Sequence, residues 1–188
     1  MTQTRDWQRN RDMWIRVLER QTGFGLDEWN RRISRARLLD EAGLRAWLTN
    51  EGLTGYARTL LVMEQFGYPD FLLASADDLI DDQYADRPHL RPIFDAIIDA
   101  ASGLEHVVIQ ARKTYVSLVA PRRTFARIVP TTKDRVDLGL RLDGKKPGGR
   151  LQPSKIHETM KLQISLTTPA EVDDEVLEWL GKAYERNA

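Results

Sequence analysis

The sequence has no cysteine among its 188 residues. This absence excludes a disulfide-stabilised scaffold, thiolate catalysis and metal sites built on cysteine ligands, and it is typical of a reducing compartment. No window approaches eighteen uninterrupted apolar residues, and the N-terminal residues alternate Arg and Asp with Trp, unlike a secretory signal. We therefore expect a soluble, cytoplasmic protein.

The sequence also has no net charge. The 28 Lys and Arg residues balance the 28 Asp and Glu residues, so no overall attraction to nucleic acid or to anionic lipid follows. A composition that is 41% hydrophobic and 30% charged is typical of an ordered globular protein. At this length the chain forms one large domain or two small ones.

Catalytic and metal-binding motifs are missing too. No G-x-S-x-G, Walker or G-x-G-x-x-G pattern occurs in the required strand–turn–helix context. The histidines at His89, His106 and His157 lie far apart and lack the H-x-x-x-H spacing that places two imidazoles on one helical face. We expect no metal, no cofactor and no catalytic residue, and an enzyme is the least favoured of the functions considered.

What the sequence does contain is a change of hydrophobic period. Up to Pro69 the apolar residues repeat at helical spacing, whereas from Val107 to Thr167 they alternate with period two. This change predicts a helical module over residues 1–69 and an α+β module over residues 70–188. Asp40 and Thr54 are suited to cap two of the helices in the first module, and Gly67 followed by Pro69 is suited to end the last.

The second module is predicted to be an antiparallel meander of about five strands covered by amphipathic helices. Alternation is clearest around residues 136–142 and 160–167, and weaker at 107–111, 115–119 and 125–129. An acidic helix is expected near residues 77–84, a longer helix from Pro88 or Pro92 to Ala101, and a final helix over 169–186. The fold class is therefore α+β.

Charge is sorted along the chain although its sum is zero. Residues 70–106 carry 9 acidic against 2 basic side chains, whereas residues 107–161 carry 13 basic against 4 acidic ones. One interpretation is that acidic helices simply face basic strand ends, which contributes little because exposed ion pairs are worth only roughly 0–1 kcal/mol each. The other interpretation is an anion site on the uncovered face of the sheet.

On the second interpretation, cationic strand residues and one aromatic residue form the site. The strand prediction places Asp137 and Asp143 on the same face as Arg135 and Arg141. These two carboxylates would repel a phosphate backbone. Two functions follow: a binding or adaptor protein for a small anion or a protein segment, or a nucleic-acid-binding protein that also uses the arginines between residues 31 and 37. The candidate site residues are Lys113, Tyr115, Arg127, Arg135, Arg141 and Lys161.

Two further features have both a structural and a functional interpretation. Gly148, Gly149 and Arg150 could form a backbone nest for an anion, but a flexible hairpin loop explains them equally well. The aspartates between residues 77 and 82 could hold a divalent cation, although such a run is usually a solvated helix face.

Short segments of the chain resemble two uncharacterised families. Residues 22–29, 46–48 and 52–57 are similar to domain of unknown function 4287, a short helical module. Residues 90–95, 113–118, 125–126 and 137–140, with Tyr84, resemble domain of unknown function 5655. The resemblance implies a bacterial protein with a two-part layout and carries no assigned catalytic residue. The resemblance also points to Lys113, Tyr115 and Gly139. One explanation for these residues is that a ligand or a backbone segment approaches closely there; the other is a strand edge or bulge.

Overall fold

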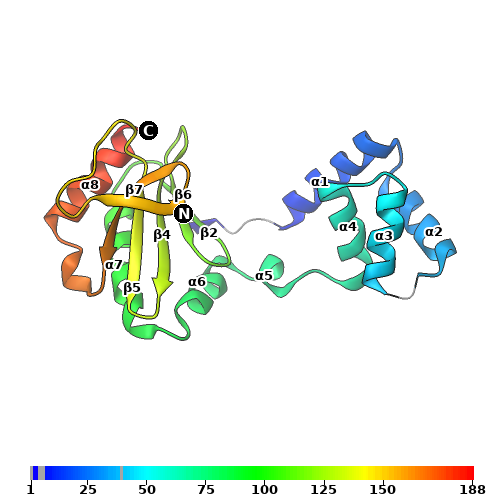
Figure 1. Ribbon diagram of the computed structural model, residues 1–188, viewed down its shortest axis with the longest axis horizontal. Helices are drawn as coiled ribbons and strands as arrows, with labels where there is room; N and C mark the ends of the chain where they lie inside the picture. The colour runs from blue at the N-terminus through cyan, green and yellow to red at the C-terminus, as the bar shows by residue number, and fades with distance from the viewer. Residues whose placement is uncertain (1, 4–6, 39) are drawn as a thin grey trace. The chain divides into compact units, whose positions relative to one another are not determined.

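The computed structural model describes residues 2–3, 7–38 and 40–188, and the chain divides into two compact units. One unit contains the described residues from 7 to 74. The other contains residues 75–188 together with the short strand β1 (Thr2–Gln3). Figure 1 labels the elements of both.

The first unit is entirely helical. Its helices are α1 (Trp7–Thr22), α2 (Leu26–Ala36), α3 (Glu41–Asn50), α4 (Gly55–Phe66) and the single turn α5 (Asp70–Leu73). Asp40 caps α3, since its carboxylate accepts a hydrogen bond of 2.6 Å from the Gly43 amide. Thr54 occupies the cap position of α4, but its side chain makes no capping hydrogen bond. Its hydroxyl instead accepts a hydrogen bond from the side-chain amide of Gln21.

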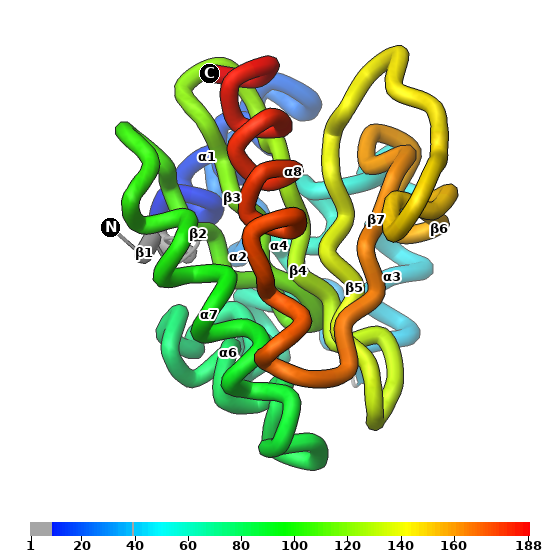
Figure 2. The backbone as a smooth tube through the Cα atoms, turned by 90° about the vertical axis from the view of Figure 1, so that its left-hand side faces the viewer, coloured from blue at the N-terminus to red at the C-terminus, as the bar shows by residue number. Residues whose placement is uncertain are grey.

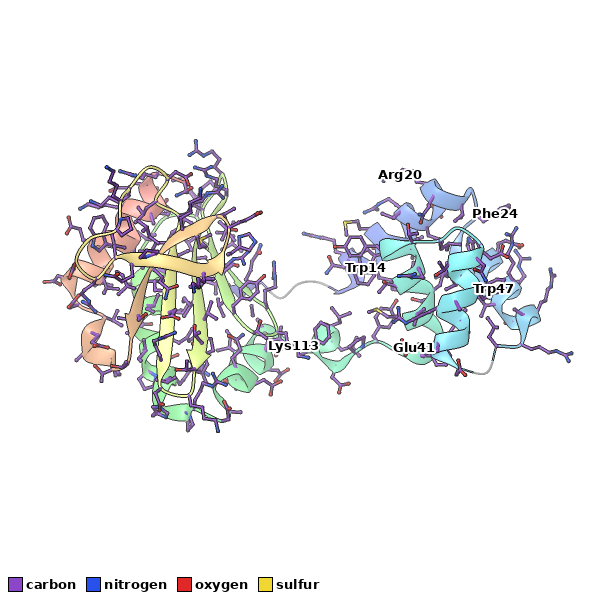
Figure 3. The ribbon with its side chains drawn as sticks, viewed as in Figure 1. Trp14, Arg20, Phe24, Glu41, Trp47 and Lys113 are labelled. Carbon is purple, nitrogen blue, oxygen red and sulfur yellow. The ribbon has the colours of Figure 1, made fainter. Side chains whose placement is uncertain are left out.

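Aromatic side chains and leucines form the core of this unit. Trp14 stacks on Tyr56 with ring centres 5.6 Å apart, and Trp29 meets Trp47 edge-on at 6.2 Å. Trp14 and Trp47 are labelled in Figure 3. Buried Leu18 packs in the same cluster. None of these short helices would be stable alone, so this shared core holds them together.

The second unit combines helices with one mixed sheet. Its helical elements are α6 (Ala76–Tyr84), η1 (Pro88–Leu90), α7 (Arg91–Ser102), η2 (Pro169–Glu171) and α8 (Asp174–Glu185). Ser75 and Asp78 form a capping box at the start of α6. The single final helix that the sequence predicts over residues 169–186 is divided in the structure. The short 3-10 turn η2 comes first, and α8, which Asp173 caps, follows it.

The strands are β2 (Val108–Ala111), β3 (Val116–Val119), β4 (Thr124–Thr132), β5 (Arg135–Leu140), β6 (Gln152–His157) and β7 (Met160–Leu166). With β1, the sheet order is β1-β2-β3-β4-β5-β7-β6; β1 pairs with β2 in parallel and all other pairs are antiparallel. The α+β class with an antiparallel sheet is confirmed, but the sheet has more strands than the five expected. Strand β6 was missed because Pro153 and the lack of alternation hide it.

One face of the sheet forms the core of the unit. Helices α7 and α8 run across this face, as Figure 2 shows from their side. Val136, Leu138 and Leu140 of β5 point towards the helices and are fully buried, and Phe125 of β4 meets Tyr184 of α8 edge-on at 5.6 Å. The alternate residues of the same strands necessarily point to the opposite, uncovered face.

In the described part of the chain, no helix combines the length and the apolar character needed to cross a bilayer.

Candidate functional site

The uncovered face of the sheet carries polar side chains in two neighbouring rows. In one row, Arg127 of β4 lies between Ser117 of β3 and Gly139 of β5. In the next row, Asp137 of β5 lies between Val129 and Ser165. Register therefore places Arg127 and Asp137 on the same face, one diagonal step apart, which is roughly 7–8 Å in an antiparallel sheet.

A cavity of about 530 Å³ opens on this face. This volume is in the range of small-molecule sites, roughly 300–1,000 Å³. The sheet forms its floor and β6 forms a wall. The lining residues are Thr114, Tyr115, Arg127, Val129, Thr131, Arg135, Asp137, Pro153, Lys155, Ile156 and Gln163.

The wall exists because Gly139 lets β6 approach the sheet. A Cβ atom at Gly139 would lie 2.9 Å from Cδ1 of Ile156 and 3.3 Å from Cβ of Met160. Any larger residue would therefore push Ile156 away. The approach expected at this glycine is made by a side chain of the chain itself, Ile156, which brings the neighbouring Lys155 to the cavity.

Arg127 is held in place by an aromatic ring. Its guanidinium carbon lies 4.6 Å from the centre of the Tyr115 ring, which is a cation–π contact. Its Nε atom is buried and has no hydrogen-bond partner, and no carboxylate among the described residues forms an ion pair with it. The charge of Arg127 is therefore left without an anionic partner from the described part of the protein.

Asp137 is the most deeply buried charged residue of the cavity, with a side chain only 2% exposed. The Ser165 hydroxyl donates to Asp137 Oδ1 at 2.6 Å, and Nε of Arg135 lies 3.1 Å from the same oxygen. The Arg135 Nε–H is not directed at that oxygen, so the contact is an ion pair without a hydrogen bond. Arg135 thereby neutralises the carboxylate next to it on its own strand.

The net charge of the cavity is positive. Arg127, Arg135 and Lys155 contribute three cations, against the single carboxylate of Asp137. Lys155 is exposed, and no described carboxylate forms an ion pair with it. After Arg135 is paired with Asp137, the charges of Arg127 and Lys155 are uncompensated within the cavity.

Three of the six residues expected at the site line this cavity: Tyr115, Arg127 and Arg135. The other three lie elsewhere. Lys113, labelled in Figure 3, is exposed in the turn between β2 and β3. Arg141 follows β5 and lies 3.7 Å from Asp143, and Lys161 is exposed on β7; neither lines the cavity.

The residues that sequence reasoning missed are Lys155 and Ile156. Both lie on β6, which contains a proline and lacks alternation, so nothing in the pattern placed them near the sheet. The alternation of β5 places Asp137 on the correct face, where a carboxylate alone predicts an obstacle to anions. Its spacing from Arg135 was an available signal, because residues two apart on a strand share a face and can pair.

The glycine-rich loop before β6 is held by its arginine. Arg150 donates to Asp173 at 2.7 Å and to the backbone carbonyl of Glu171 at 2.8 Å, which ties the loop to the start of α8. Arg150 therefore has a structural partner. Backbone amides of Thr167 and Thr168 hold the pKa of Glu171 below its usual range at the same place.

Two aspartates of the acidic run of α6 have local structural partners. Asp78 completes the capping box with Ser75, and Asp81 pairs with Arg91 at 2.5 Å. Within the ranges 2–3, 7–38 and 40–188, no group of three or more His, Asp or Glu side chains could hold a metal ion.

Most of the α+β unit matches the model of a known family. The family model described as Domain of unknown function (DUF5655) matches residues 80–187, which is more than half of the chain and includes every residue that lines the cavity. No curated protein matches the chain, and no solved structure does.

Proposed function

The chain belongs to the DUF5655 family. We propose that its α+β unit binds a small anionic molecule in the cavity on the uncovered face of the sheet. The family description assigns no activity, so the proposal depends on the chemistry of this cavity. The observation that carries it is the pair of uncompensated cations, Arg127 and Lys155, in a concave site of ligand size.

The position of Arg127 favours binding of an anion over a purely structural role. A structural arginine is normally paired, as Arg150 is with Asp173 and Arg91 is with Asp95. Arg127 instead has a fixed ring beneath it and no carboxylate partner among the described residues. A carboxylate or phosphate would supply the missing anionic partner, and the preorganised guanidinium would lose little entropy on binding.

The rest of the lining favours a ligand with an apolar body. Val129, Pro153 and Ile156 surround the charged groups. Such a mixture of apolar walls with a few fixed polar groups is characteristic of sites for small organic molecules. An inorganic ion would leave these walls in contact with water.

Calorimetric titration of the full chain with phenyl phosphate and with phenylpropanoate tests the proposal, with phenylpropanol as the uncharged control. We expect saturable one-to-one binding of at least one of the two anions, weakening with salt, and no binding of the alcohol. Arg127→Gln and Lys155→Gln should each weaken binding about tenfold, because each removes one charge-assisted contact. Lys161→Gln, which removes a cation outside the cavity, should leave it unchanged.

Absence of saturable binding for both anions would overturn the proposal, as would equal affinity in wild type and in both cavity variants. A single-stranded oligonucleotide added in parallel distinguishes the nucleic-acid alternative. That alternative replaces the proposal if the oligonucleotide alone binds and its affinity falls steeply with salt.

We further infer, from residue resemblance alone, that the helical unit is a module of the type called domain of unknown function 4287 and that the protein is bacterial. The residues that support this lie on α1 to α4, with Trp29 and Trp47 in contact in the core. A cytoplasmic location is proposed from the lack of cysteine.

A further inference from the structure

The cavity contains a buried acceptor as well as cations. Asp137 is almost completely buried, yet it lines the cavity. An ionised carboxylate offers about four lone-pair positions. Among the described residues, Asp137 accepts one hydrogen bond, from Ser165, and has one ion-pair contact, with Arg135. It therefore retains acceptor capacity that only a molecule in the cavity can use.

This arrangement restricts which anions fit. A molecule with only acceptor groups would leave the remaining lone pairs of the Asp137 carboxylate without a donor. A molecule with a hydroxyl or amino group at that position would instead donate to the carboxylate. The donor would take the place of water, and a hydrogen bond to a charged group is stronger than one between neutral groups.

Resting on the proposed function, we propose that the natural ligand is amphoteric: a small molecule with a carboxylate or phosphate group for Arg127 and Lys155, and a hydroxyl or amino donor for Asp137. The two groups lie at opposite ends of a short apolar body. The register makes Arg127 and Asp137 diagonal neighbours of β4 and β5, with Cα atoms roughly 7–8 Å apart, so both side chains start from the same face. Val129 and Ile156 flank the body between them.

A para-substituted aromatic acid carries an acid group and a donor at opposite ends of one apolar ring. The aromatic ring would lie against the apolar wall formed by Pro153 and Ile156.

Three probes with one skeleton test this inference on the full chain: phenylpropanoate, para-hydroxyphenylpropanoate and para-methoxyphenylpropanoate. The hydroxyl compound can donate to Asp137, whereas the methoxy compound has the same oxygen without the hydrogen. We expect the hydroxyl compound to bind about tenfold more tightly than either of the others. The same order is expected for para-aminophenyl phosphate over phenyl phosphate.

Asp137→Asn provides the matched variant, since it keeps the shape and removes the charge. The tenfold preference for the hydroxyl compound should fall to less than threefold in this variant, while phenylpropanoate binds at least as tightly as before. Because this substitution removes the ion-pair partner of Arg135 and could destabilise the protein, the unfolding midpoint of the variant is measured first. The comparison of the hydroxyl and methoxy probes on the wild-type protein does not depend on the variant.

The possible failures are distinct. If none of the anions binds, the proposed function itself is wrong. If phenylpropanoate or phenyl phosphate binds but the donor-bearing probes bind no more tightly, the anion site stands and the assignment of an amphoteric ligand is overturned. If the hydroxyl compound is preferred equally in wild type and Asp137→Asn, the donor does not reach Asp137 and the assignment is also overturned.

Discussion

Cδ1 of Ile156 lies 2.9 Å from the position that a Cβ atom would occupy at Gly139. This contact between a β6 side chain and the floor of the sheet creates the wall of the cavity. The absence of a side chain at residue 139 is therefore a requirement of the site, although the backbone conformation there is ordinary.

Gly139→Ala should destabilise the α+β unit by about 1 kcal/mol, the lower end of the cost of overpacking, because the clashing atom is the end of a side chain that can rotate. The hairpin would move away from the sheet, so affinity for the anionic probes should fall as well. Thermal unfolding and probe titration measure the two effects.

The double variant Gly139→Ala/Ile156→Val is the control for steric origin. Valine lacks Cδ1, so this second change should restore most of the stability lost in Gly139→Ala. If the double variant is as destabilised as the sum of the two single variants, the contact does not form the wall.

Tyr115 and Arg127 should act as a unit. Tyr115→Phe keeps the ring and the cation–π contact, so probe affinity should change less than twofold. Tyr115→Leu removes the ring and frees Arg127 to rotate, so affinity should fall about threefold to tenfold. Calorimetry on both variants checks this, and equal losses in the two would show that the hydroxyl matters instead of the ring.

The helical unit should lose stability at alkaline pH through Tyr68. Burial and a hydrogen bond donated to Glu64 raise the pKa of the Tyr68 hydroxyl to about 12. The folded state therefore favours the protonated phenol. The stabilisation is fully present below the unfolded pKa of about 10 and is lost as pH rises towards 12. Urea unfolding followed by tryptophan fluorescence between pH 9 and 12 measures it.

Tyr68→Phe is the comparison for this prediction. The difference in unfolding free energy between wild type and Tyr68→Phe should shrink across the same pH window, which separates Tyr68 from every other alkaline titration in the chain. A difference that stays constant from pH 9 to 12 would contradict the assignment.

Glu64 should also make the same unit sensitive to acid. Arg11 donates two hydrogen bonds to its carboxylate, at 2.6 and 3.0 Å, and these lower the pKa of Glu64. The stabilisation is present above the usual glutamate pKa and is lost as pH falls through the lower folded value. Glu64→Gln should cost about 1–2 kcal/mol at pH 7 and almost nothing near pH 2, whereas exposed Glu51→Gln should be neutral at both.

The sequence predicts those parts of the fold and of the site that lie on strands with a clear hydrophobic alternation. Strands β5 and β7 alternate cleanly, so their inward and outward residues, including Arg135 and Asp137, were assigned correctly. The β6 wall depends on Gly139 meeting Ile156, two residues far apart in the chain, and neither has a local pattern that reveals the contact. Likewise, which outward cations converge depends on how far along each strand they lie, and this places Lys161 outside the cavity.

Chemical-shift mapping of the isotope-labelled full chain titrated with phenyl phosphate and with phenylpropanoate tests the central claim most directly. With at least one of the two probes, we expect saturable shifts centred on the amides of four residues. They bring the ring, the cations and the carboxylate to one cavity: Tyr115, Arg127, Asp137 and Lys155. No saturable shifts with either probe, or shifts centred on Lys113, Lys161 or the helical unit, would contradict it.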